Sequence, residues 1–206
     1  MIESDTYKTI SKSSSEVLFK DKNSKFFGYV FPVSTEENVK KHLEVLKKQH
    51  HSASHWCYAY QIGKQEKEHV FRANDDGEPN NSAGMPIYGQ IKSFGVTNVL
   101  IIVVRYFGGT KLGVSGLINA YKTASQMALE ESKIIIKTIN VTYQITFEYK
   151  NMNKVMRIIK EKNLKILNQT LEVNCQMEFS VRKKNADVIF GILNALQEID
   201  IKVLND

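Results

Sequence analysis

The chain has 206 residues, of which 42% are hydrophobic and 24% are charged. These proportions are typical of a globular protein, and the length suffices for one large domain or two small ones. No segment reaches the roughly 18 consecutive apolar residues of a membrane span, and the polar N-terminus lacks the apolar stretch of a secretory signal. We therefore expect no membrane partner and a cytoplasmic location.

The formal net charge is +6. A basic excess favours polyanionic partners, because Lys and Arg neutralise phosphates and release counterions. Many proteins of similar charge bind no polyanion, so charge alone leaves both interpretations open. The two cysteines, Cys57 and Cys175, are far apart and match neither a disulfide framework nor a zinc site.

In chain order, the first part of the sequence mixes patterns of period two, which predict strands, with patterns of helical spacing. The predicted strands are a pair around a polar turn at 16–33, then 55–62, 68–74 and 99–107. The predicted helices begin at a Ser34 cap followed by Glu37, near Ser82–Pro86, and after the loop that follows residue 107. Because the run at 99–107 is continuously apolar, we expect that strand to be buried on both faces.

From about residue 137 the predicted elements follow the order βαββαβ. They are strand 139–149, helix 152–163, strands 164–172 and 173–182, helix 186–199 and strand 201–204. This order is typical of the ferredoxin-like arrangement. We therefore predict an α+β protein with two domains, 1–136 and 137–206.

The apolar strand ends on Arg105 and runs into a loop that contains Gly108, Gly109, Gly113 and Gly116. Glycines let a ligand approach the backbone, and a following helix N-terminus favours negative charge. A nucleotide-binding phosphate loop would need Lys-Ser/Thr after its last glycine, where this chain has Val114-Ser115, so we do not expect an NTPase.

Two interpretations of this loop remain open. In the first, the backbone amides with Arg105 and Lys111 hold a phosphate of RNA or of a nucleotide-like ligand. In the second, the glycines form a tight turn, and Arg105 pairs with a carboxylate of the acidic turn Asp75-Asp76-Gly77-Glu78. That turn itself suits either a hard cation such as Mg²⁺ or ordinary turn hydrogen bonding.

Other candidate residues give weaker signals. His51 and His55 are four residues apart, which suits a metal only on a continuous helix. Four aromatic residues, Tyr58, Tyr60, Tyr106 and Phe107, lie near basic residues and could stack bases, although core packing is the commoner explanation at strand spacing. The run 182–184 is basic, and we expect a solvated helix start, with nucleic-acid contact as the lesser alternative. No nucleophile arrangement is visible, so we assign no catalytic residue.

The stretches RANDDGEPNNSAGMPI (72–87) and VVRYFGGTKLGVSGLINAY (103–121), together with HWCYAY (55–60), resemble the signature motifs of the YigZ/IMPACT family. This resemblance implies a first domain like the second domain of ribosomal protein S5 and a second like the ferredoxin-like domains of elongation factor G. Because proteins that handle RNA use both of these domain types, the resemblance also implies a function that involves RNA. Eukaryotic relatives regulate translation through an extra N-terminal domain that we do not expect here, so their partner is not carried over.

The sequence departs from the family pattern at a few positions. They are Asn81 and Ser82 after the acidic turn, Ser115 in the loop, and Asn119 in the helix. Asn119 stands where the family has Arg, so a positive charge is missing from the expected phosphate site.

Our hypothesis is a non-catalytic RNA- or ribosome-associated protein that acts in translation control. The residues assigned to phosphate or RNA binding are Arg105, Tyr106, Gly108, Gly109, Lys111 and Gly113, with the acidic turn Asp75, Asp76 and Glu78 facing them and His55 and Tyr58 as neighbours. The alternatives are a Mg²⁺-dependent enzyme for a small phosphorylated or nucleotide substrate, with the magnesium at the acidic turn, and a protein-interaction module. No other cofactor is expected.

Overall fold

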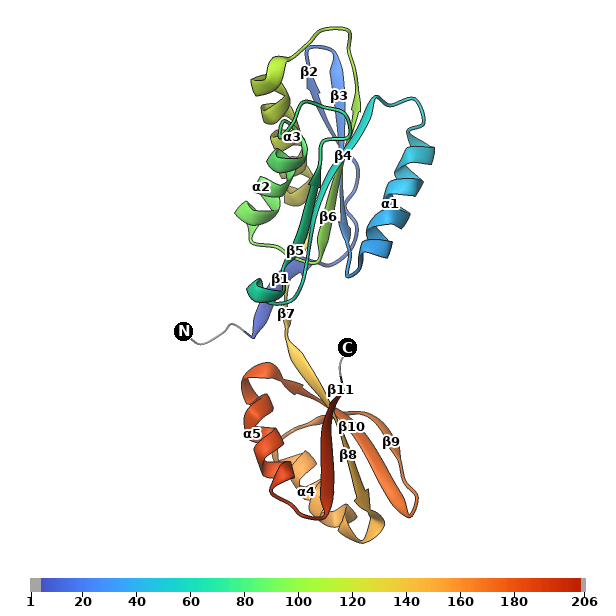
Figure 1. Cartoon of the computed structure of the whole chain (residues 1–206), viewed down its shortest axis with the longest axis vertical. Coiled ribbons are helices and arrows are strands. Elements are labelled where there is room, and N and C mark those ends of the chain that lie inside the picture. The colour runs from blue at the N-terminus through green and yellow to red at the C-terminus, as the bar shows by residue number, and fades with distance from the viewer. Residues whose placement is uncertain (1–4, 205–206) are drawn as a thin grey trace. The chain divides into compact units, whose positions relative to one another are not determined.

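The computed structural model describes residues 5–204 and divides them into two compact units (Figure 1). The first unit spans residues 7–137, and the second spans 138–204 together with Asp5 and Thr6. Each unit combines helices with a sheet, so the predicted α+β class with two parts is confirmed. The sequence-based division assigned the whole N-terminus to the first part, whereas Asp5 and Thr6 cluster with the second.

The first unit is built on a five-stranded antiparallel sheet. In spatial order its strands are β2 (Val17–Asp21), β3 (Ser24–Pro32), β6 (Val99–Tyr106), β4 (His55–Ile62) and β5 (Val70–Asn74). The central strand β6 is the continuously apolar run of the sequence, and it is buried from Val99 to Arg105. The predicted burial of this strand on both faces is confirmed.

Helices cover both faces of this sheet (Figure 1). Helices α2 (Gly84–Phe94) and α3 (Gly113–Glu130) lie on one face, and α1 (Glu36–Gln49) lies on the other. Because side chains alternate along a strand, Ile101 and Val103 of β6 pack in the core under α2 and α3. Their neighbours Ile102 and Val104 pack in the core under α1.

The first unit also contains shorter elements, two of which extend by one residue into the second unit. Strands β1 (Thr6–Ile10) and β7 (Ile134–Thr138) form a separate two-stranded sheet that we did not predict, and residues Glu66–Glu68 form a 3₁₀ turn. The cap of α1 is Thr35, whose hydroxyl accepts the Asn38 N–H at 3.2 Å, one residue later than predicted.

The second unit has a four-stranded antiparallel sheet in the order β11–β8–β10–β9. Its elements are β8 (Asn140–Glu148), a 3₁₀ turn (Tyr149–Asn151), α4 (Met152–Glu161), β9 (Lys165–Thr170), β10 (Asn174–Arg182), α5 (Lys183–Asn194) and β11 (Ile199–Leu204). The predicted order βαββαβ is confirmed. Arg182 forms a bidentate ion pair with Asp5, so the basic run at 182–184 is partly neutralised.

Within residues 5–204, every helix is too short or too polar to serve as a membrane crossing.

The C-cap residue of α1, His50, is a buried histidine of the first unit. The His50 ring nitrogens lie 2.6 Å from the Tyr29 hydroxyl and 3.0 Å from the Tyr106 hydroxyl. Tyr29 in turn donates a hydrogen bond to Glu16. Burial lowers the pKa of His50, and the nearby Glu16 carboxylate opposes that effect. Burial lowers the pKa of His42 as well.

This arrangement predicts acid-sensitive stability. Because the pKa of His50 is lower in the folded than in the unfolded chain, the unfolded chain binds more protons below about pH 6.5. The free energy of unfolding should therefore fall as the pH drops below that value. In urea titrations at a series of pH values, His50→Gln should flatten this dependence, whereas His51→Gln, at an exposed histidine, should not. Equal profiles for both variants would contradict the prediction.

Candidate functional site

The acidic turn follows β5 and has an unusual backbone. Asp76 and Gly77 have positive φ values of 44° and 87°. The Asn74 side chain accepts the Asp76 N–H at 2.7 Å, and the Asp75 carbonyl accepts the Glu78 N–H at 2.9 Å. The first bond is that of an Asx turn and the second is the backbone bond of a β-turn, so the turn conformation is established by its own residues.

Asp75 caps helix α2. Its Oδ1 accepts the backbone N–H groups of Ala83 at 2.9 Å and Gly84 at 2.8 Å, and its Oδ2 accepts that of Asn81 at 2.9 Å. The residue at the cap position of α2 is Ala83, which has no acceptor side chain. Asp75 therefore caps the helix although it lies outside it in the sequence, and the helix dipole also favours a negative charge at this end.

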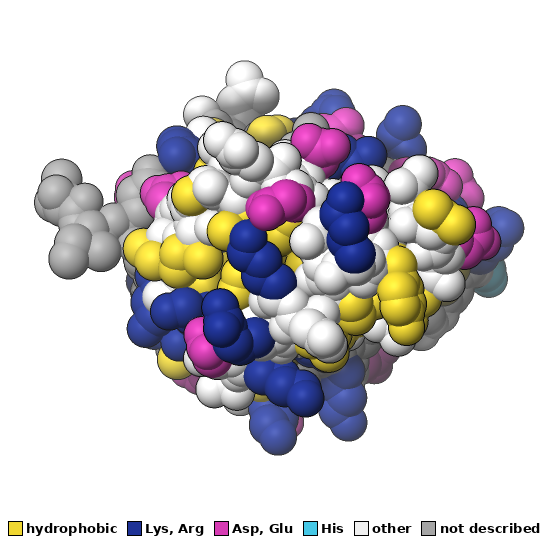
Figure 2. Space-filling view, turned by 90° about the horizontal axis from the view of Figure 1, so that it is seen from below, with side chains coloured by type: hydrophobic (Ala, Val, Ile, Leu, Met, Phe, Trp, Pro, Cys, Tyr) yellow, Lys and Arg dark blue, Asp and Glu magenta, His cyan; other side chains and the backbone are white. Residues whose placement is uncertain are grey.

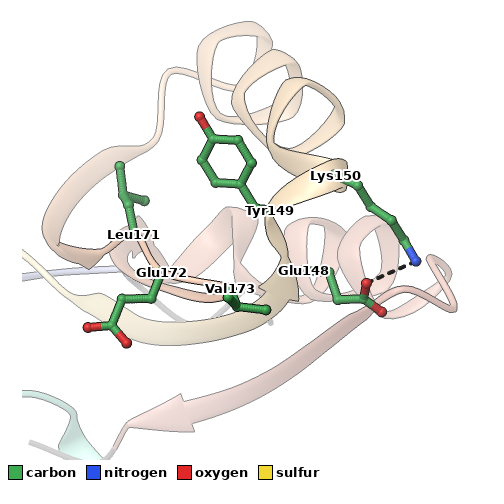
Figure 3. Close-up of a pocket in the computed structure, with 6 residues that line it drawn as sticks. All are labelled: Glu148, Tyr149, Lys150, Leu171, Glu172 and Val173. Carbon is green, nitrogen blue, oxygen red and sulfur yellow. Dashed lines mark ion pairs between the residues drawn. The ribbon is translucent and has the colours of Figure 1, made fainter.

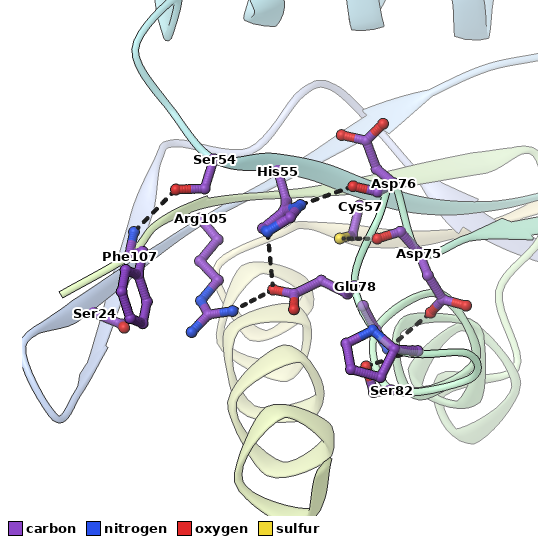
Figure 4. Close-up of polar contacts among 12 residues, drawn as sticks. Ser24, Ser54, His55, Cys57, Asp75, Asp76, Glu78, Ser82, Arg105 and Phe107 are labelled. Carbon is purple, nitrogen blue, oxygen red and sulfur yellow. Dashed lines mark hydrogen bonds and ion pairs between the residues drawn. The ribbon is translucent and has the colours of Figure 1, made fainter. Parts of the chain in front are cut away.

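Asp76 ties the turn to the start of β4. Its Oδ2 accepts the backbone N–H of Trp56 at 2.7 Å, and its carbonyl lies 2.8 Å from Nδ1 of His55. The Nδ1–H of His55 therefore donates to this carbonyl. His55 and Arg105 are directly paired residues of β4 and β6, so the turn, the histidine and the arginine lie together (Figure 4).

Glu78 and Arg105 form a buried ion pair. Glu78 Oε1 accepts hydrogen bonds from Arg105 Nη1 at 2.5 Å and from the Tyr121 hydroxyl at 2.8 Å, and His55 Nε2 lies 3.9 Å away. The side chains of Glu78 and Arg105 are only 4% and 6% exposed. Burial, with the neighbouring Cys57 and Glu78, raises the pKa of Tyr121, so its hydroxyl remains a donor.

Cys57 lies beside this pair and is fully buried. Its Sγ is 2.9 Å from the Asp75 carbonyl oxygen and 3.3 Å from the Tyr121 hydroxyl. Burial raises the pKa of the thiol well above its ordinary value. Because the thiolate is the nucleophilic form, this cysteine is arranged for packing and hydrogen bonding.

The glycines of the loop serve different purposes. A Cβ on Gly108 would lie 2.1 Å from the Asn23 backbone, and the Gly108 N–H donates to Ser24 Oγ at 3.1 Å, so this glycine lets the loop contact the β2–β3 turn. Gly109 and Gly113 have positive φ values of 86° and 75° and open space around their Cα atoms. The open side of the loop is therefore accessible to a ligand.

Exposed lysines and free helix amides accompany the loop. Lys111 is exposed, and the adjoining β2–β3 turn adds the exposed Lys22. Helix α3 begins at Gly113 without a side-chain cap and has no acidic residue in its first turn. Its first N–H groups have no intrahelical acceptors, and the helix dipole places partial positive charge there.

The structure brings together only some of the predicted site residues. Arg105, His55 and the acidic turn meet on the α2–α3 side of the sheet. Tyr58 and Tyr106 pack on the opposite side, where Tyr58 stacks with Tyr60 and Tyr106 contacts Phe27. Sequence reasoning missed Tyr121 and Lys22. Tyr121 could have been found as the one aromatic residue on the buried, otherwise mostly small face of α3.

These contacts bear on the two interpretations of the loop. Arg105 pairs with a carboxylate of the acidic turn, which was the second of them. A direct contact between Arg105 and phosphate stays a prediction. No group of three or more His, Cys, Asp or Glu side chains arranged to hold a metal occurs among residues 5–204. Asp75, Asp76 and Glu78 all accept internal hydrogen bonds, so each carboxylate has a structural role in the turn.

A separate pocket lies in the second unit. It has a volume of about 410 Å³ and is lined by Glu148, Tyr149, Lys150, Leu171, Glu172 and Val173 (Figure 3). Tyr149 and Val173 are largely exposed. Figure 2 shows one face of the molecule, on which exposed hydrophobic side chains alternate with many Lys and Arg side chains. None of the predicted site residues lines this pocket.

Comparisons with known proteins match most of the chain. A family model for the Impact N-terminal domain matches residues 22–129. IMPACT family member YvyE of Bacillus subtilis (strain 168) is 30% identical over 182 residues, 88% of this chain and 82% of the relative. IMPACT family member YigZ of Escherichia coli (strain K12) is 31% identical over 147 residues, 71% of this chain and 72% of the relative. A crystal structure of an hypothetical protein, 23% identical, shares the fold over 100% of both chains with a TM-score of 0.72.

The buried ion pair predicts a large effect of Glu78→Ala. This change would leave the Arg105 guanidinium buried without its carboxylate, which costs about 3 to 5 kcal/mol of unfolding free energy. Denaturant unfolding monitored by circular dichroism measures the loss. The control is Glu198→Ala, which removes an exposed ion pair with Lys154 and should change stability far less. Similar losses for both variants would refute the structural importance of the pair.

The loop geometry predicts that Gly→Ala substitutions at neighbouring positions lower the stability of the protein by different amounts. Gly108→Ala places a methyl group against the Asn23 backbone and should lower stability by about 2 kcal/mol or more. Gly109→Ala has free space but a left-handed backbone, so about 1 kcal/mol is expected. Gly89→Ala, inside α2 with free space, should be neutral or stabilising. Thermal unfolding of the three variants measures this ranking, and a greater loss at Gly109 than at Gly108 would contradict it.

Proposed function

The chain belongs to the YigZ/IMPACT family, and on that premise we propose that it is a non-catalytic RNA- or ribosome-associated protein acting in the regulation of translation. The glycine loop of the first unit is the proposed contact site. The translational setting follows from the family resemblance of the two signature stretches. The site itself is argued from the residues that surround the loop.

The accessible side of the loop is the observation that carries this proposal. Gly109 and Gly113 adjoin open space, and α3 begins there with uncapped N–H groups. Exposed Lys111 in the loop and exposed Lys22 in the β2–β3 turn add positive charge. Backbone amides at a helix N-terminus together with lysines are common phosphate contacts in nucleic-acid complexes. The net charge of +6 supports the same class of partner.

The neighbouring polar groups support binding more than catalysis. A metal-assisted reaction would use the carboxylates of the acidic turn, but Asp75 caps α2 and Glu78 pairs with Arg105. A covalent mechanism would use a thiolate, but burial keeps Cys57 protonated. These groups therefore hold the loop in place, and the exposed lysines and amides remain for a ligand.

A protein-interaction role has one observation in its favour. The pocket of the second unit has apolar walls from Tyr149, Leu171 and Val173, all of which are exposed (Figure 3). Exposed apolar clusters of this kind often mark contacts with other proteins. This role is compatible with RNA binding by the first unit, because the two sites share no residues.

The proposal predicts salt-dependent RNA binding through Lys111. Binding of a fluorescent single-stranded RNA should weaken as salt rises, with log K falling by about 0.7 per phosphate contacted for each unit of log salt. Lys111→Gln should reduce this slope by about one contact and weaken binding at low salt. Fluorescence anisotropy at several salt concentrations measures both quantities, and purified ribosomes provide a second target.

The matched control is Lys40→Gln, at an exposed lysine of α1 on the other face of the sheet. It should leave the slope unchanged. Equal effects of the two substitutions would place RNA binding away from the loop. Absence of measurable binding to RNA and to ribosomes would overturn the proposed function.

A further inference from the structure

One edge of the Arg105 guanidinium is unused. Nη1 donates to Glu78, but the buried Nε–H has no hydrogen-bond partner among residues 5–204. The residue is 5% exposed. Buried polar groups nearly always have a partner in native proteins, so an N–H left without one is a donor available to a ligand.

The ring of Phe107 covers this guanidinium. Its centroid lies 5.5 Å from the Arg105 Cζ, and Phe26 lies at a similar distance of 5.4 Å. Figure 4 shows Arg105 between Phe107 on one side and Glu78 on the other. Phe107 is 50% exposed, whereas Phe26 is fully buried. The cover over Arg105 is therefore a side chain that solvent already reaches.

Phe107 can uncover the arginine without movement of the backbone. The backbone N–H of Phe107 donates to Ser54 Oγ at 3.3 Å, and that of Gly108 donates to Ser24 Oγ at 3.1 Å. These bonds hold the start of the loop. Exposed side chains change rotamer within picoseconds to nanoseconds, so rotation of the ring would expose the face of the guanidinium that it covers.

The chemistry around this edge suits a phosphate. Arginine binds phosphate oxygens through its N–H groups with charge-assisted hydrogen bonds. Glu78 lies on the other side of the guanidinium, so it does not occupy the edge at Nε. The exposed Lys111 lies on the loop and the exposed Lys22 on the turn that the loop contacts, and both add positive charge near the site.

We propose that Arg105 Nε, under the Phe107 ring, binds a terminal phosphate monoester. This inference rests on the proposed function and specifies its ligand. An internal phosphodiester carries chain on both sides, both of which would have to pass the Phe107 ring, whereas a terminal phosphate carries one substituent. A monoester also has a charge of about −1.5 to −2 at neutral pH, which strengthens its hydrogen bonds to arginine.

The test compares two forms of one short RNA, labelled at its 3′ end and carrying either a 5′-phosphate or a 5′-hydroxyl. By fluorescence anisotropy, the full chain should bind the phosphorylated form about tenfold more tightly, as expected for an added charge-assisted contact. Competition with adenosine 5′-monophosphate, with adenosine as control, distinguishes the two sources of a monoester. Strong competition by the nucleotide identifies a free nucleotide, and weak competition identifies an RNA end.

Two variants test the residues. Arg105→Lys keeps a cation beside Glu78 but lacks the Nε–H, so the preference for the 5′-phosphate should disappear. Phe107→Ala removes the cover without touching the ion pair, and binding of the phosphorylated RNA should tighten by about threefold or more because the open state no longer competes with the closed one. Phe71→Ala is the matched control, since Phe71 is 49% exposed and stacks on Tyr88 elsewhere in the unit. It should change neither quantity.

Equal affinities for the two RNA forms, in the wild type and in Phe107→Ala, would overturn the inference and leave the proposed function intact. Binding of the nucleotide without binding of either RNA would overturn the proposed function and support the monoester site. If Arg105→Lys fails to fold, as circular dichroism would show, the Phe107 and Phe71 variants decide the question.

Discussion

The ion pair between Arg105 and Glu78 is the interaction on which the first unit depends. It joins the end of the central strand to the acidic turn, and Tyr121 extends it to α3. Such a buried pair gains little net energy over an apolar contact, because desolvation offsets the attraction. Each partner nevertheless requires the other, since either alone would be a buried charge. The position of the turn is thereby coupled to the position of the loop.

The three carboxylates of the acidic turn show how similar residues take different tasks. Asp75 satisfies the amides at the start of α2, Asp76 holds the first residues of β4, and Glu78 neutralises Arg105. In the sequence they form one acidic cluster that is equally typical of a cation site. Only the direction of each side chain distinguishes the three tasks, and a turn with positive φ values sets those directions.

The elements of the fold could be predicted from the sequence where hydrophobic periodicity is strong. The apolar run of β6 and the βαββαβ order of the second unit are examples. The contact between Gly108 and Ser24 could not, because it joins residues 84 positions apart and leaves no local pattern. On the sequence alone we grouped Tyr106 with Arg105 in one binding site, although the two-residue period of a strand argues against that grouping. Arg105 and Tyr106 are adjacent in a strand, so their side chains must point to opposite faces.

The ion pair between Asp5 and Arg182 affects the order in which the two units can fold during synthesis. Asp5 also accepts the N–H of Ile139 through its carbonyl, so the second unit combines Asp5 and Thr6 with residues that follow the first unit in the sequence. During synthesis the first unit can fold as it emerges from the ribosome, since its residues form one continuous stretch. Asp5 can form its ion pair only after Arg182 has been synthesised, 177 residues later.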